Sequence, residues 1–311
     1  MGSFALWYSS EKKSEAISAE IHFNLWNLHL KRIPPFLDIG IKVSDIKQID
    51  EVCFYIPFIV KKEDITDLGC MLKTAEILDA VFNEHYSVTH VGNDKIVSIS
   101  DETGKKVFNI YCLDIDNDIV VTNEFRGAML QIKVPKSTKA TGEPLYLRFR
   151  LTSSNFKKII KEYKPSNIVF QSAFSIIEAL DFRFNDYRSL HISLLEHIKI
   201  KSRFNINKVH FLLLTNSNVD LIYNTPNSGR ELENNIWDKY LNGILAEDII
   251  AYHWKFKSDI EKNMENCILF IKTKYHRCNW KTIIVYLLGL GILTIFFNLA
   301  SSFLWILIGG R

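Results

Sequence analysis

The run of residues 282–309 reads TIIVYLLGLGILTIFFNLASSFLWILIG. None of its 28 residues carries a charge, and 20 of them are apolar. A helix of this length, rising ~1.5 Å per residue, would be ~42 Å long, whereas the hydrocarbon core of a membrane is ~30 Å thick. The run therefore predicts a single transmembrane helix over 282–309, in preference to a buried core helix.

Basic residues are concentrated before this run. Five of them precede it and one follows it: Lys272, Lys274, His276, Arg277 and Lys281 before, Arg311 after. Basic residues favour the cytoplasmic side of membrane helices, and the first residues contain no basic segment followed by an apolar run of the kind that marks a signal peptide. We therefore expect a single-pass protein of the cell inner (cytoplasmic) membrane, with the bulk of the chain in the cytosol.

The composition of the whole chain excludes two classes of protein. The 311 residues carry 38 Lys and Arg against 35 Asp and Glu, for a net charge of +3, and 47% of them are apolar. These values exclude a histone-like basic protein and a mainly disordered chain. The five cysteines are scattered and form no Cys-x-x-Cys pair, which is typical of a reducing compartment and predicts neither a disulfide framework nor a zinc site.

Short strands separated by turn residues dominate 54–151. The clearest is 145–151, where apolar and polar residues alternate, and one helix is expected over 68–86. Beyond the Lys164-Pro165 break, 209–215 and 219–223 read as a β-hairpin. We expect an α+β fold with a mostly antiparallel sheet, divided into a cytosolic domain over 1–164 and a second α/β cytosolic segment over 165–257.

Residues 258–281 read as a helical stalk. They contain no Gly or Pro, and the apolar residues Ile260, Met264, Cys267, Ile271 and Tyr275 recur at spacings of three and four. Such spacing approximates a heptad seam. Two interpretations remain open: a helix that packs on its own domain, and a stalk that associates with copies of itself.

Small and polar residues lie close to one face of the predicted membrane helix. They are Gly291, Thr294, Asn298, Ser301 and Ser302. Small and hydroxyl side chains allow membrane helices to approach closely, and a lone Asn in hydrocarbon is costly. The stripe predicts either a tight interface in a homo-oligomer or the lining of a narrow pore. On a straight helix it would face away from the stalk seam, so a break near Gly289-Leu290-Gly291 or a multi-helix bundle is needed to reconcile the two.

A basic and aromatic stretch is the best candidate for ligand binding. The candidate residues are Arg183, Arg188, Lys199, Lys201, Arg203, Phe204 and Lys208. Lys and Arg could hold the phosphates of a nucleotide or DNA oligomer, with Phe204 or Tyr187 stacking on a base. The alternative is that these basic residues stay in water and pair with Asp181 and Asp186.

The sequence contains no catalytic constellation, so we expect no catalytic residue, no metal ligand and no cofactor. Standard motifs for nucleotide hydrolysis, serine hydrolysis and zinc proteolysis are absent. Residues 114–125 lack the Gly and Glu that a calcium loop requires. Asp116 or Asp118 followed by Gln131 and Lys133 faintly resembles the carboxylate-then-lysine arrangement of restriction-type nucleases.

In layout, the chain resembles membrane channel effectors of bacterial antiphage defence, in particular the Hailong-type protein with a soluble crown and a channel. The resemblance covers the soluble part, the stalk over 258–281 and the span over 282–309, and it carries over no site residue. It implies an oligonucleotide ligand, a homo-oligomer in the lipid bilayer and a gated pore. The alternatives are a tail-anchored nuclease or hydrolase, and a tail-anchored adaptor protein.

Overall fold

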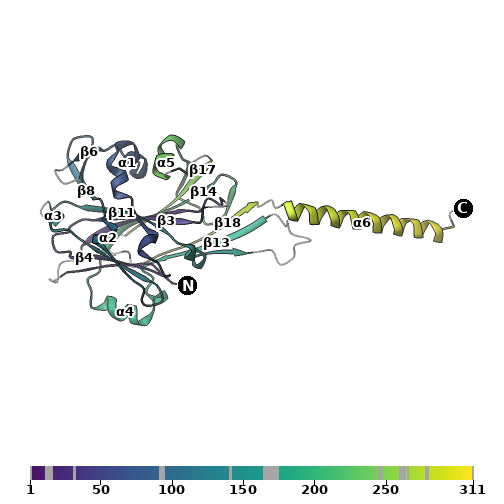
Figure 1. Ribbon diagram of the computed structural model, residues 1–311, viewed down its shortest axis with the longest axis horizontal. Helices are drawn as coiled ribbons and strands as arrows, with labels where there is room; N and C mark the ends of the chain where they lie inside the picture. Colours follow the sequence, from purple (N-terminus) through teal and green to yellow (C-terminus); the bar gives the residue numbers. More distant parts are fainter. Residues whose placement is uncertain are drawn as a thin grey trace.

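Three β-sheets form the body of the protein in the computed structural model (Figure 1). The structure describes residues 2–10, 17–30, 33–90, 95–139, 142–163, 175–241, 243–244, 248–258, 264, 266–276 and 280–309. Among the described strand pairs, only β14 with β2 and β11 with β8 run parallel. The predicted α+β class with mostly antiparallel sheets is therefore confirmed.

The large sheet has the order β16-β17-β14-β2-β3-β11-β8-β7-β6, and β5 also pairs with β11. Its strands are β2 Ser18–Trp26, β3 Phe36–Val43, β5 Ile65–Asp67, β6 Ser87–His90, β7 Ile96–Ser100, β8 Lys106–Tyr111, β11 Leu145–Thr152, β14 Asn205–Asn216, β16 Ser228–Glu231 and β17 Ile249–Lys257.

Two four-stranded sheets complete the strand structure. The β4 sheet has the order β1-β4-β10-β9 and contains β1 Ala5–Ser9, β4 Glu51–Ile56, β9 Ile119–Thr122 and β10 Ala128–Lys133. The β18 sheet has the order β12-β13-β18-β15 and contains β12 Ile160–Tyr163, β13 Ser175–Phe184, β15 Val219–Tyr223 and β18 Cys267–His276.

Helices are short except for the last one. The α-helices are α1 Ala75–Phe82, α2 Ile115–Asp118, α3 Lys136–Lys139, α4 Ile192–Lys199, α5 Asn234–Leu241 and α6 Trp280–Leu307. The 3-10 helices are η1 Lys62–Asp64, η2 Gly69–Lys73, η3 Ser154–Lys158 and η4 Tyr187–Ser189.

An aromatic core joins the large sheet to the two smaller sheets. The Phe182 ring of β13 lies 4.7 Å from that of Phe23 on β2 and 4.6 Å from that of Phe211 on β14, measured between centroids. Phe54 of the β4 sheet belongs to the same cluster. The opposite face of the large sheet packs against α1 and α5, and α4 covers the outer face of the β4 sheet. The body is thus layered, with one face of the large sheet turned toward α1 and α5.

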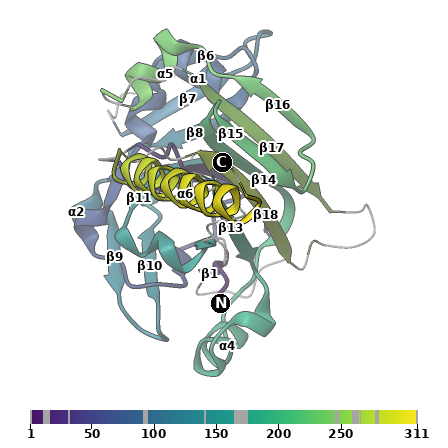
Figure 2. The ribbon, with the colours of Figure 1, turned by 90° about the vertical axis from the view of Figure 1, so that its right-hand side faces the viewer.

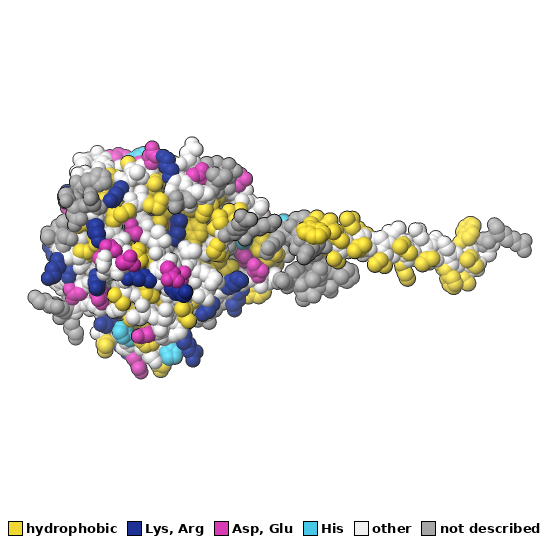
Figure 3. Space-filling view, viewed as in Figure 1, with side chains coloured by type: hydrophobic (Ala, Val, Ile, Leu, Met, Phe, Trp, Pro, Cys, Tyr) yellow, Lys and Arg dark blue, Asp and Glu magenta, His cyan; other side chains and the backbone are white. Residues whose placement is uncertain are grey.

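The C-terminal helix α6 projects from the end of the body where β13 and β18 lie (Figures 1 and 2). Its segment Ile283–Leu307 has a mean hydropathy of 2.3, and none of it is buried against the body. Figure 3 shows its surface as mostly hydrophobic, without charged side chains among the residues drawn in colour. The prediction of one C-terminal helix that is long and apolar enough to span a membrane is confirmed. The helix runs unbroken through Gly289 and Gly291, so the predicted break is absent there.

The predicted stalk helix over 258–281 is wrong for Cys267–His276, which form strand β18. Cys267, Leu269, Ile271, Thr273 and Tyr275 are buried there, and the residues that alternate with them are exposed or half-buried. Residues four apart, such as Cys267, Ile271 and Tyr275, lie on one face of either a helix or a strand. That spacing therefore could not separate the two structures. Residues 259–263, 265 and 277–279 of the predicted stalk lie outside the described residues.

The predicted division into 1–164 and 165–257 does not correspond to separate sheets. Strand β14 from the second segment pairs with β2 from the first along nearly its whole length, and both belong to the large sheet. The Lys164-Pro165 break itself lies outside the described residues. The predicted hairpin is also wrong, because β14 pairs with β17 whereas β15 pairs with β18.

Candidate functional site

A polar cavity of about 480 Å³ lies on the face of the large sheet that carries α1. We call it the basic pocket. Its charged and histidine lining consists of Lys42, Arg148, Lys208, Arg230 and Lys255, the carboxylates Glu20 and Glu84, and His22, His210 and His253. Five cations therefore face two carboxylates.

Strand pairing explains why these residues meet. Alternate residues of a strand point to the same face. Glu20 on β2 lies opposite Lys42 on β3 and Lys208 on β14. Two residues further along β2, His22 lies opposite His210, which in turn lies opposite Lys255 on β17. The pocket is therefore a patch of cross-strand neighbours on one face of the sheet.

The three histidines are packed together and are uncharged at neutral pH. His210 Nδ1 lies 3.0 Å from His253 Nε2, and the His22 and His210 rings are 4.9 Å apart between centroids. Burial, followed by the nearby charges of His253 and Lys255, lowers the pKa of His210 to about 4. Burial is likewise the main cause that lowers the pKa of His22 and of His253. The positive charge of the basic pocket therefore comes from Lys and Arg.

Arg148 is the central cation of the pocket and is fully buried. Its Nε donates to the Tyr240 hydroxyl and its Nη1 to the Tyr146 hydroxyl, both at 2.9 Å. With the Asn24 amide oxygen turned toward it, Nη2 donates to Asn24 Oδ1 at 2.9 Å. Gly40 makes room for Tyr146, because a Cβ atom there would overlap the Tyr146 hydroxyl. In the described part of the chain, all hydrogen-bond partners of the Arg148 guanidinium are neutral.

The Asp38 carboxylate, whose charge acts on Arg148, forms its hydrogen bonds with other residues. Asp38 accepts two hydrogen bonds from Arg150, at 2.6 and 3.0 Å, and one from Trp26 Nε1 at 2.9 Å. It also accepts one from the Tyr240 hydroxyl at 2.8 Å. Burial alone would lower the pKa of Arg148, but Tyr146, Tyr240 and Asp38 together raise it, so the guanidinium stays charged. Asp38 thus forms its ion pair with the half-buried Arg150, and its charge also acts on the fully buried Arg148.

A buried charge without a carboxylate of its own is costly, and a bound anion would offset part of that cost. The lysines at the rim could contribute, because neither Lys42 nor Lys255 has a carboxylate partner among the described residues, whereas Lys208 Nζ lies 2.8 Å from Glu20 Oε1. Phe82 and Tyr86 add aromatic surface to the lining. Chemically, the arrangement is suited to bind a phosphate-bearing molecule.

The sequence-predicted ligand residues divide between two places. Lys208 lines the basic pocket. Arg183 pairs with Asp181 and Asp186, and Arg188 pairs with Asp186, as the alternative interpretation had it. The remaining four, Lys199, Lys201, Arg203 and Phe204, lie in or just after α4 and do not line the pocket.

Phe204 cannot stack on a ligand as predicted, because its ring is only 7% exposed and packs on Tyr8 at 4.7 Å between centroids. Tyr187 is covered in a similar way, since the Arg203 guanidinium lies 4.6 Å from its ring centroid. The two aromatic residues that were predicted to stack on a base, Phe204 and Tyr187, thus pack against other side chains of the protein.

Some of the residues that resemble a nuclease site form hydrogen bonds within the protein. Asp118 accepts hydrogen bonds from the Tyr111 hydroxyl at 2.8 Å and from Asp114 N at 2.9 Å. Asp116 and Lys133 line a shallow hollow of about 660 Å³, whereas the Gln131 amide contacts Glu51. Asp118 therefore has a structural role in holding its loop.

The predicted stripe on α6 is exposed along its length. The Thr294 hydroxyl donates to the Leu290 carbonyl at 2.8 Å, and the Ser302 hydroxyl donates to the Asn298 carbonyl at 2.9 Å. These hydroxyls are satisfied within the helix, which is how such groups are tolerated in a membrane. The amide of Asn298 has no such partner among the described residues.

A buried carboxylate lies beside the strand that precedes α6. The Glu178 side chain on β13 is 7% exposed, and its Oε2 accepts a hydrogen bond from Asn27 Nδ2 at 2.8 Å. His29 Nε2 lies 3.6 Å from that oxygen, and the His29 ring packs on Tyr275 of β18. Burial raises the pKa of Glu178 to about 7 and lowers that of His29 to about 4.

The Glu178 carboxyl predicts a pH-dependent stability. The unfolded chain loses this proton near pH 4.5 and the folded protein only near pH 7, so its contribution to stability is present below pH 4.5 and is lost as the pH rises through 7. The charged form costs about 3 kcal/mol above that range. Glu178→Gln is expected to stabilise the protein at about pH 8 and to have little effect near pH 4.5, measured by chemical denaturation.

The matched control is Glu162→Gln. Glu162 lies directly opposite Glu178 on β12 but is exposed. Its charge is a secondary cause of the raised pKa of Glu178, so its removal should stabilise the protein at pH 8 much less than Glu178→Gln does. An equal effect of Glu178→Gln at both pH values would contradict the interpretation.

Fold and site together define an α+β body that carries a basic pocket and one candidate membrane helix. No protein-family model matches the chain, and no curated protein matches it in sequence.

Proposed function

We propose that the chain is a membrane-anchored sensor whose body binds a phosphate-bearing ligand in the basic pocket. The observation that carries this proposal is Arg148, a fully buried guanidinium with neutral hydrogen-bond partners at the wall of a cavity rich in lysine. An anionic ligand supplies a counter-charge in addition to that of Asp38, and a phosphate accepts the several hydrogen bonds that Arg and Lys offer.

A nucleotide or short oligonucleotide is the ligand class that the lining favours. The volume of about 480 Å³ lies in the range of small-molecule sites and accommodates about one or two nucleotides. Phe82 and Tyr86 could stack on a base beside the cations. Both features agree with the oligonucleotide ligand that the resemblance in layout implies.

The strands of the pocket provide a route from ligand to membrane helix. His22 and His210 line the pocket, and the next residues in each strand, Phe23 and Phe211, pack on Phe182 of β13. Phe182 lies opposite Leu269 of β18, the strand that precedes α6. A shift of β2 or β14 on ligand binding would therefore reach the base of α6 through packed aromatic rings.

The proposed output is a gated pore formed by several copies of α6 in the cytoplasmic membrane, with the body in the cytosol. Asn298, with Thr294 and Ser302 one turn to either side, offers polar contacts between copies. Antiphage defence is the setting that the resemblance suggests. A tail-anchored adaptor would need neither the basic pocket nor this stripe. A tail-anchored nuclease would need Asp116, since Asp118 is held by Tyr111 and Asp114, and Asp116→Asn would abolish its activity.

The test is the binding of a fluorescently labelled DNA hexamer to the full chain in nanodiscs, followed by fluorescence anisotropy. Wild-type protein is expected to bind saturably, more weakly at high salt, and to release the probe on addition of ATP. The double variant Lys42→Gln/Lys255→Gln should weaken binding by about tenfold or more, because it removes two charged contacts.

The matched control is Lys199→Gln/Lys201→Gln, which removes two lysines of the sequence-predicted stretch outside the pocket. It should bind as wild type does. Loss of binding in this control, with retention in the pocket variant, would move the site to the α4 region and contradict the proposal.

A further inference from the structure

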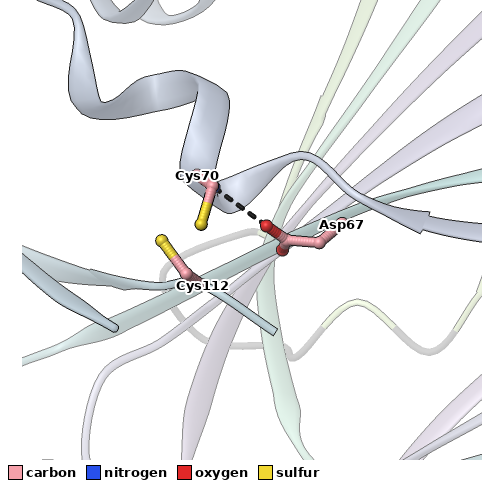
Figure 4. A group of neighbouring side chains, drawn as sticks. All are labelled: Asp67, Cys70 and Cys112. Carbon is pink, nitrogen blue, oxygen red and sulfur yellow. Dashed lines mark hydrogen bonds between the residues drawn. The ribbon is translucent and has the colours of Figure 1, made fainter. Parts of the chain in front are cut away.

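Three potential metal ligands converge outside the basic pocket. Asp67 ends β5, Cys70 lies in η2, and Cys112 directly follows β8. One ligand atom from each lies within 4.8 Å of the other two. Figure 4 shows the two sulfur atoms pointing toward each other, with the Asp67 carboxylate beside Cys70.

The backbone holds the Asp67 carboxylate in a fixed orientation. Its Oδ1 accepts hydrogen bonds from Gly69 N and Leu113 N, both at 3.0 Å, and its Oδ2 accepts one from Cys70 N at 2.9 Å. A carboxylate offers about four lone-pair sites, so one on Oδ2 remains for a further partner. Ligands of metal ions are commonly oriented by hydrogen bonds of this kind.

The turn itself brings the two thiols together. In the sequence Asp67-Leu68-Gly69-Cys70, the first and last side chains emerge on the same side of a tight turn. Gly69 allows this turn to lie against the end of β8, because a Cβ atom there would overlap the Tyr111 carbonyl. Cys112, one residue further, is 3% exposed and faces Cys70.

The simplest alternative is that Asp67 only caps the turn. A capping role explains the three hydrogen bonds of Asp67. It does not explain why Cys70 and Cys112, which come from different elements, face each other beside the Asp67 carboxylate. Cysteine sulfur and carboxylate oxygen are both ligands that zinc binds in proteins. Cys70 is exposed, so a water molecule can reach the fourth position of a tetrahedral ion.

We propose that Asp67, Cys70 and Cys112 bind one Zn²⁺ ion, with water as the fourth ligand. Tetrahedral bonds of ~2.3 Å to sulfur and ~2.0 Å to oxygen require ligand atoms ~3.5–3.8 Å apart, within reach of the present arrangement. Each thiol gives up its proton, so binding releases two protons to solvent. The ion would tie η2 to β8 and thereby fix the start of α1, whose other end lines the basic pocket.

The test is a titration of the reduced, metal-free full chain in detergent with Cd²⁺, which reports thiolate binding through its ultraviolet charge-transfer band. One Cd²⁺ per chain is expected, and Zn²⁺ should displace it. Cys70→Ser and Cys112→Ser should each abolish the band, and Asp67→Asn should weaken binding by about tenfold. Because Cys70 is exposed, Cys70→Ser is expected to keep the wild-type circular dichroism spectrum.

Cys53→Ala is the matched control, since Cys53 is a buried cysteine of the β4 sheet, and it should leave the titration unchanged. The proposal is overturned if no saturable band appears, or if the band survives in either Cys70→Ser or Cys112→Ser. A Cys70–Cys112 disulfide found by mass spectrometry in protein that binds no Zn²⁺ after reduction would overturn it as well.

Discussion

Replacement of Arg148 by Met is expected to weaken ligand binding about 100-fold and to cost the ligand-free protein less stability than the loss of a buried ion pair does. The guanidinium is fully buried and contacts neutral groups, so an apolar side chain of similar length removes a desolvated charge. The substitution also leaves Tyr146, Tyr240 and Asn24 without their hydrogen-bond partner, at a cost of about 1–3 kcal/mol for each unpaired group. Removal of the desolvated charge offsets part of that cost. Loss of charged hydrogen bonds to a phosphate should cost about 3 kcal/mol of binding free energy, or about 100-fold in affinity.

The same substitution two residues away provides the control. Arg150 lies on the same face of β11 and forms the ion pair with Asp38, so Arg150→Met leaves a buried carboxylate without its salt bridge. A loss of about 3–5 kcal/mol in stability is expected. Chemical denaturation measures the stability of both variants, and fluorescence anisotropy measures their binding of the hexamer. Arg148→Met should lose mainly binding, whereas Arg150→Met should lose mainly stability. If Arg148→Met lost as much stability as Arg150→Met, the charge would serve the fold and not a ligand.

Deletion of residues 280–311 is expected to release the whole body from membranes. The segment Ile283–Leu307 makes no buried contact with the body, so the truncated chain should keep its fold. Its apolar side chains are the main exposed hydrophobic surface of the described chain, and their transfer into lipid provides the anchoring free energy. Liposome flotation measures the effect: full chain in the floating fraction, truncated chain in the soluble fraction.

Asn298→Leu is the matched variant for this experiment. It keeps the helix apolar and should float like the wild type, but it removes the only amide of the stripe. Under the proposed assembly it should lower the fraction of multi-subunit complexes and the ion flux through liposomes. Flotation of the truncated chain would contradict the claim that α6 anchors the body in the membrane. Wild-type ion flux in Asn298→Leu would contradict the claim that the polar stripe forms the contacts between copies of α6.

Two local sequence patterns predicted their elements correctly, whereas the helix expected over 68–86 is a 3-10 helix over Gly69–Lys73 followed by α1 over Ala75–Phe82. The uncharged run over 282–309 corresponds to α6, and alternation over 145–151 corresponds to β11. Strands β1 to β3 were not predicted. Strand β3 is almost entirely buried and shows no regular alternation in exposure, whereas the first half of β2 does alternate. The error over Cys267–His276 has a similar origin, because a spacing of four residues fits strand and helix alike.

The basic pocket could not be predicted because its residues are far apart in the chain. Glu20 and Lys208 are joined by a parallel pairing of β2 with β14, and no local pattern encodes such a pairing. A signal was nevertheless present in single strands: the segments Glu20-Ile-His22-Phe-Asn24 and Lys208-Val-His210 place polar residues at every second position. Once strands are paired, these positions fall on one face and define the site.

The central claim is that the basic pocket of the membrane-anchored chain holds a phosphate-bearing ligand. Native mass spectrometry of the full chain, equilibrated with a 5′-phosphorylated DNA hexamer and ejected from nanodiscs, tests it most directly. We expect one hexamer per 36.1 kDa chain for wild type and none for Arg148→Met, and the same spectrum reports the number of subunits. Wild-type protein without bound hexamer, or equal occupancy in Arg148→Met, would contradict the claim.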